Sequence, residues 1–111
     1  MDSRLYLLPL FYLFVIIIFK FIENSLYRFL LLSILACYCL YLFKIKKNII
    51  LIYLFITLLA IIIEIIFIKF FKTTWYYYNK ELFVIPYWLV SLWLCAIIFF
   101  IEIYKLSIKY L

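Results

Sequence analysis

Hydrophobic positions along the chain form four long, almost uninterrupted runs, at residues 5–22, 26–43, 49–68 and 82–101. Each run approaches the roughly 20 residues that a helix needs to cross a hydrocarbon core. Polar and apolar residues do not alternate within the runs, as they would in the strands of a membrane barrel. The pattern predicts an all-α fold: an integral membrane four-helix bundle with antiparallel up-down spans, forming a single transmembrane domain over residues 1–111.

Short polar segments separate these runs. Residues 23–25 (Glu-Asn-Ser) form the first turn, the basic segment 44–48 forms the second, and residues 69–81 form the longest connection. Pro9 and Pro86 fall close to the starts of the first and fourth spans, where a missing backbone N–H is tolerated. Residues 102–111 are expected to be a short tail. An even number of spans predicts that both termini lie on one side of the membrane.

Composition strengthens the membrane prediction, because 74% of the 111 residues are hydrophobic. Soluble domains are roughly 45–50% apolar, and a soluble fold of this size could not bury so much apolar surface. Glycine and histidine are absent, which resembles the product of an AT-rich genome. Without glycine, no close GxxxG helix contact can form, so packing is expected to use small residues such as the pairs Ser33/Cys37 and Ser91/Cys95.

The net charge of +6 comes from eleven basic residues that lie mostly at the ends of the apolar runs. Lysine and arginine at such positions reach the lipid headgroups. The expected partners are therefore membrane lipids and other membrane-protein subunits, and no binding of nucleic acid is expected. The compact basic turn at residues 44–47 favours termini on the cytoplasmic or inner side. The expected location is a bacterial inner membrane or the inner membrane of an organelle.

Cysteine chemistry is not expected to carry the function. Cys37, Cys39 and Cys95 all lie inside apolar runs, and the chain has neither histidine nor a CxxC motif. The sequence therefore predicts structural cysteines, no metal site and no cofactor.

Glu64 is the acidic residue placed deepest in an apolar run, about one turn from the far end of the third span. A carboxylate at that depth is costly unless it is paired, protonated or hydrated. One interpretation is a structural ion pair with Arg28, which lies on the same side of the membrane near the start of the second span. The other is a carboxylate that binds a proton or a ligand. Glu102, by contrast, is expected to form an i,i+3 ion pair with Lys105 at the end of the fourth span.

Aromatic residues crowd the connection before the fourth span and the start of that span, as in an interfacial aromatic belt. The same segment resembles small bacterial polytopic membrane proteins, mostly uncharacterised, and some membrane proteins of carotenoid biosynthesis. They have an acidic residue, then W-x-Y, then I-P-x-W-L-x-x-L-W. The matching residues are Glu64, Trp75, Tyr77, Ile85, Pro86, Trp88, Leu89, Leu92 and Trp93. Thr74 stands where many of those proteins have glycine.

The resemblance covers about thirty residues and implies a bundle with a polar-aromatic pocket at the membrane interface. The predicted ligand-binding residues are Glu64, Trp75, Tyr77, Pro86, Trp88 and Trp93.

Several functions are compatible with the sequence. The first is a structural or accessory subunit of a larger membrane assembly. The second is a lipid- or isoprenoid-binding protein or enzyme, with Glu64 and Tyr77 as its candidate acid–base residues. The third is a small transporter, although small multidrug resistance transporters carry their essential carboxylate in the first helix and pack through glycine. Whether the protein is an enzyme therefore stays open.

Overall fold

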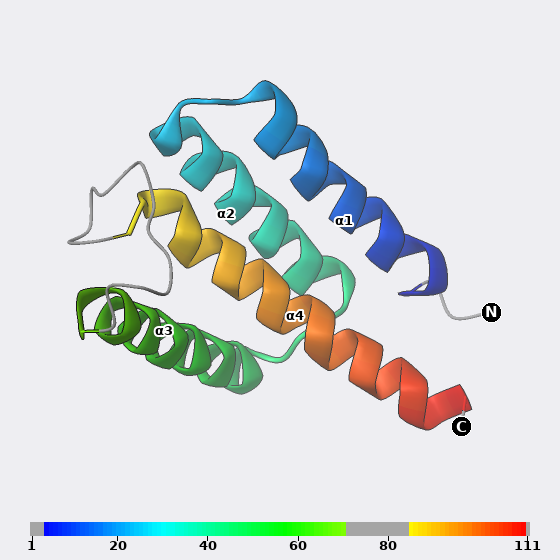
Figure 1. Ribbon diagram of the computed structural model, residues 1–111. Helices are drawn as coiled ribbons and strands as arrows, with labels where there is room; N and C mark the ends of the chain where they lie inside the picture. Colours follow the sequence, from blue (N-terminus) through cyan, green and yellow to red (C-terminus); the bar gives the residue numbers. More distant parts are fainter. Residues whose placement is uncertain (1–3, 71–84, 111) are drawn as a thin grey trace.

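The computed structural model describes residues 4–70 and 85–110, which form four helices (Figure 1). These are α1 (Arg4–Phe21), α2 (Ser25–Leu42), α3 (Lys47–Phe70) and α4 (Tyr87–Tyr110). All four are long and apolar enough to cross a membrane, by length and composition. The predicted all-α four-helix bundle is confirmed.

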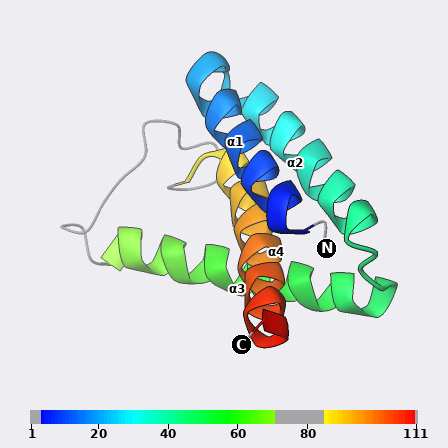
Figure 2. The same cartoon turned by 90° about the vertical axis from the view of Figure 1, so that its right-hand side faces the viewer.

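Helix α4 is the centre of the packing, because α1, α2 and α3 all contact it. Helices α1, α2 and α4 run side by side, whereas α3 crosses the other three at a steep angle (Figure 2). The bundle is therefore a group of three aligned helices with a fourth packed across α4. This arrangement leaves α3 supported mainly by one neighbour.

The α2–α4 interface supplies much of the core and is built around small side chains. Ser91 on α4 and Ser33 on α2 approach to 2.6 Å between their hydroxyl oxygens, and Cys95 Sγ lies 3.6 Å from the carbonyl of Leu32. Ala36 is fully buried beside them. Small residues thus allow the two backbones to approach closely without glycine.

Cys37 differs from the expectation, because it is exposed rather than packed. The buried face of α2 includes Ala36 and Cys39, and the side chain of Cys37 points away from that face. Successive helix residues are separated by about 100°, so a shift of one residue moves a side chain off the packing face. Of the two predicted pairs, Ser91/Cys95 lies wholly in the interface and Ser33/Cys37 only in part.

Local signals fix the start and the end of α2. Asn24 caps the start, where its side-chain oxygen accepts hydrogen bonds of 3.0 and 3.2 Å from the backbone amides of Leu26 and Tyr27. At the other end Lys44 adopts a positive φ of 55°. The polar turns predicted at these two places are therefore present, with Lys44 in a conformation that usually belongs to glycine.

The fourth helix is displaced along the chain from the predicted span. It starts at Tyr87, directly after Pro86, and it continues through the predicted tail to Tyr110. The extension is helical because Lys105 and Lys109 favour the negative end of the helix dipole and Leu106 continues the packed face. Glu102 consequently lies inside a helix rather than at its end.

Candidate functional site

Glu64 and Trp93 meet where α3 crosses α4. The indole Nε1 of Trp93 donates a hydrogen bond of 2.7 Å to Oε2 of Glu64, and both side chains are half-buried. Each residue lies six positions from the helix end that faces the connection 71–84. The sequence placed both residues in the candidate site, and the structure brings them into direct contact.

A recess of about 330 Å³ lies against this pair. Apart from the Glu64 carboxylate and the Trp93 indole, its walls are hydrocarbon. They are provided by Leu89, Leu92, Ala96 and Phe100. The recess therefore presents one carboxylate to an otherwise apolar space.

Arg28 has different partners from those expected. Its guanidinium donates hydrogen bonds to the carbonyl oxygens of Ile22 and Phe19, the latter at 3.0 Å. These carbonyls belong to the last turn of α1 and to the residue after it, where no intrahelical donor is available. Arg28 thus caps the C-terminal end of α1, and among the described residues no ion pair joins it to Glu64.

Phe19, Arg28 and Trp88 form a compact cluster that links three helices. The rings of Phe19 and Trp88 meet edge to face with centroids 4.8 Å apart. The guanidinium carbon of Arg28 lies 4.8 Å from the Phe19 centroid and 6.0 Å from that of Trp88. These cation–π distances place the Arg28 charge against aromatic faces.

The remaining candidate residues fall into two groups. Pro86 and its neighbour Ile85 are buried at the start of α4, and Trp88 belongs to the cluster with Phe19 rather than to the Glu64 recess. Trp75 and Tyr77 lie outside the described residues. Of the four predicted ligand-binding residues that the structure describes, Glu64 and Trp93 line one recess, and Pro86 and Trp88 lie outside it.

A larger groove, of about 480 Å³, runs between α1 and α4. Its walls are almost entirely apolar, and Arg4 stands at the end where α1 begins. The apolar wall residues include Leu8, Pro9, Tyr12, Val15, Cys95 and Phe99. The sequence reasoning missed this groove, because the runs that form it are apolar on every side.

The groove and the Glu64 recess share one stripe of α4: Leu92, Ala96 and Phe100 line both. These residues are spaced four apart, so they lie on one helix face. Ala96 at the centre carries the smallest side chain of the three. The α4 stripe therefore separates α1 from α3 and forms the floor of both hollows.

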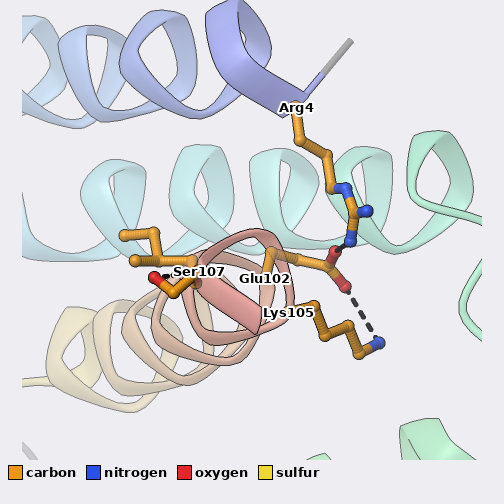
Figure 3. A network of polar contacts seen from close by, with 5 residues as sticks. Arg4, Glu102, Lys105 and Ser107 are labelled. Carbon is orange, nitrogen blue, oxygen red and sulfur yellow. Dashed lines mark hydrogen bonds and ion pairs between the residues drawn. The ribbon is translucent and has the colours of Figure 1, made fainter. Parts of the chain in front are cut away.

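Arg4, which lines the groove, pairs with the most buried charged side chain among the described residues, Glu102, which is only 2% exposed. Its Oε2 lies 2.8 Å from Nη1 of Arg4 on α1, and its Oε1 lies 3.3 Å from Nζ of Lys105 (Figure 3). The expected contact with Lys105 is present. The contact with Arg4 was missed, although Arg4 starts α1, Glu102 lies in the C-terminal half of α4, and the two side chains have opposite charge.

In the described part of the chain, no three His, Cys, Asp or Glu side chains come together. The three cysteines are unpaired thiols; Cys39 and Cys95 are buried.

The fold and the two hollows together define a small four-helix membrane protein with apolar grooves that end at charged residues. No protein family, curated protein or solved structure matches the chain.

Proposed function

We propose that this protein binds the hydrocarbon chain of a membrane amphiphile, a lipid or an isoprenoid, in the groove between α1 and α4. The supporting observation is the groove itself, about 480 Å³ of apolar space with a single charged residue, Arg4, at one end. Binding sites for small molecules are typically apolar hollows with a few polar groups that fix orientation. A hydrocarbon chain in this groove would contact the complementary apolar walls of α1 and α4 instead of loosely packed lipid.

The α4 stripe extends this binding surface towards α3. Because Leu92, Ala96 and Phe100 also line the recess beside Glu64, a ligand lying on the stripe can contact both hollows. In this proposal Glu64 and Trp93 form the polar boundary at the opposite end from Arg4. From Trp93 to Glu102 there are nine residues of helix, or about 14 Å, which is the reach of a medium-length hydrocarbon chain.

Substitution of Ala96 tests the proposal, since a larger side chain there fills both hollows. Ala96→Phe should reduce the amount of lipid that remains with the purified protein, measured by mass spectrometry of an organic extract. Ala96→Leu should give a smaller reduction. Cys37→Phe is the matched control, because Cys37 is exposed on α2 and lines neither hollow.

The outcome is decisive if the variants keep their helical circular dichroism and elute as the wild type does. A wild-type protein without retained lipid would contradict the proposal. So would equal retention by the Ala96 variants and the Cys37 control.

A structural or accessory subunit is the second candidate function, and α3 favours it. Its buried residues form one narrow stripe of Tyr53, Thr57, Ile61 and Ile68, so most of its apolar surface is exposed. A neighbouring subunit that packed on α3 would cover this surface. Purification in a mild detergent tests the idea, because an accessory subunit should elute with a stoichiometric partner and a lone lipid-binding protein should not.

For the topology, we propose that both termini lie on the cytoplasmic or inner side of a bacterial or organellar inner membrane. The basic residues at the α2–α3 turn support this orientation. Epitope tags at the two ends, combined with protease treatment of sealed vesicles, provide the test. Tags that are protected on opposite faces would contradict the four-span arrangement, and two tags on the outer face would contradict the orientation alone.

A further inference from the structure

The charged cluster at the Arg4 end of the groove is built around one carboxylate and two cations. Glu102 is 2% exposed, whereas the side chains of Arg4 and Lys105 are 22% and 46% exposed. The negative charge is therefore buried behind the positive charges. Arg4, the charged residue that lines the groove, is therefore more exposed than the carboxylate with which it pairs.

The wider charge distribution at this end of the bundle has the same sign. The described basic residues at the start of α1, in the α2–α3 turn and in the last turns of α4 are Arg4, Lys44, Lys46, Lys47, Lys105 and Lys109. Glu102 is the one acidic residue that accompanies them among the described residues. Cations near a membrane surface attract anionic lipid headgroups.

We infer that the amphiphile is an anionic phospholipid whose phosphate-bearing headgroup is held by Arg4 and Lys105 while one chain lies on the α4 stripe. This inference rests on the proposed function and adds the chemical class of the ligand. Arg4 is suited to the role because it lines the groove directly. A guanidinium presents its N–H donors in a planar fork that matches the geometry of phosphate oxygens.

Glu102 acts in this site as a positioning residue. Its ion pair of 2.8 Å holds the Arg4 side chain at the groove end, and Lys105 is held one helical turn away on α4. Without the carboxylate, the two long side chains would extend separately towards the membrane surface. Glu102 therefore keeps the two cations together beside the groove end.

Lipid competition in nanodiscs tests the inference. The full-length protein is reconstituted in an equal mixture of phosphatidylglycerol and phosphatidylcholine with identical chains, and the lipids retained after extraction in mild detergent are counted by native mass spectrometry. The wild type should retain phosphatidylglycerol over phosphatidylcholine by about fivefold or more, since one cation near a headgroup is worth about that factor.

Lys105→Gln is the main variant, because it leaves the Arg4–Glu102 pair in place. It should shift the retained ratio towards one while the total amount of retained lipid stays near that of the wild type. Lys20→Gln, which removes an exposed cation at the opposite end of α1, is the matched control and should keep the wild-type ratio. Arg4→Lys keeps the charge but loses the fork, so it should give an intermediate ratio.

The results separate the two proposals. Retained lipid with a ratio near one in the wild type, or equal ratios for Lys105→Gln and Lys20→Gln, would overturn the anionic headgroup while leaving chain binding intact. Absence of retained lipid of either kind would overturn chain binding itself. A retained second copy of the protein in place of lipid would assign the groove to a protein interface.

Discussion

Trp93 on α4 donates a hydrogen bond of 2.7 Å to the carboxylate of Glu64 on α3, the helix that packs across α4. The bond joins α3, which packs mainly on one neighbour, to the centre of the packing. A hydrogen bond to a charged group contributes more than one between neutral groups. In an apolar environment the same bond also replaces a hydrogen bond to water that the Glu64 side chain would otherwise lose.

The first prediction is that Glu64 is energetically coupled to Trp93 and not to Arg28. Trp93→Phe should lower the free energy of unfolding by about 1–2 kcal/mol, and Glu64→Gln by less, because the amide oxygen still accepts a hydrogen bond. Thermal unfolding in detergent of both single variants and the double variant gives the coupling.

The matched cycle replaces Trp93→Phe by Arg28→Gln. The effects of Glu64→Gln and Arg28→Gln should add, because Arg28 caps α1 through the carbonyls of Phe19 and Ile22. Coupling in the Arg28 cycle, together with additive effects in the Trp93 cycle, would contradict this prediction and support the Glu64–Arg28 ion pair that the sequence suggested.

The second prediction concerns the pair of Arg4 and Glu102. Glu102→Leu removes the carboxylate that Arg4 and Lys105 share, and should cost about 3 kcal/mol. Arg4→Met should cost less, because Lys105 still pairs with the buried Glu102. The double variant Arg4→Met/Glu102→Leu should recover most of that loss, because apolar residues of similar size can replace such a pair. Unfolding in detergent is the measurement, and Lys109→Gln, one turn beyond Lys105, is the control. A double variant as unstable as the sum of its parents would refute the prediction.

The third prediction concerns Tyr53, whose hydroxyl is buried on α3 without a hydrogen-bond partner among the described residues. An unsatisfied buried hydroxyl destabilises the folded state. Tyr53→Phe should therefore leave the stability unchanged or raise it by about 1 kcal/mol, whereas Tyr53→Ala should lower it through the cavity it leaves. A lower melting temperature for Tyr53→Phe would show that the hydroxyl has a partner in the membrane-embedded protein.

Much of the fold could be predicted because continuous apolar runs leave helices as the natural way to satisfy the backbone in a membrane. The contacts between helices could not, because a run that is apolar on every side does not indicate which face packs. On α3 the buried stripe of Tyr53, Thr57 and Ile61 is surrounded by equally apolar residues. The rotation of α3 about its own axis decides whether Glu64 contacts Trp93 or another group, and the pattern of apolar residues does not predict that rotation.

Arg28 shows a second reason. Its charge and its side of the membrane suggested Glu64, but the end of α1 offers uncapped carbonyls only six to nine residues away along the chain. A nearby helix end competes well with a distant carboxylate, because little chain entropy is lost in reaching it. The structure brings Glu64 into contact with Trp93, while the cationic partner expected for Glu64 caps the end of α1.

The last prediction uses the absence of glycine from the chain. The end of α2 is a Schellman motif, in which the amide of Ile45 bonds to the carbonyl of Leu40 at 3.0 Å and that of Lys44 to Tyr41 at 3.1 Å. Lys44 occupies the left-handed position of this motif with a φ of 55°. The left-handed conformation costs a residue with a Cβ atom about 1 kcal/mol, and glycine is the usual occupant because it avoids that cost.

Lys44→Gly should therefore raise the free energy of unfolding by about 0.5–1 kcal/mol, with Lys44→Asn between glycine and the wild type. Lys46→Gly is the matched control, because it removes a lysine from the same turn at a position without positive φ. Its loss of chain rigidity should leave stability unchanged or lower it. Thermal unfolding of the variants in one detergent gives the comparison. If Lys44→Gly were no more stable than Lys46→Gly, the left-handed residue would not limit the stability of this turn.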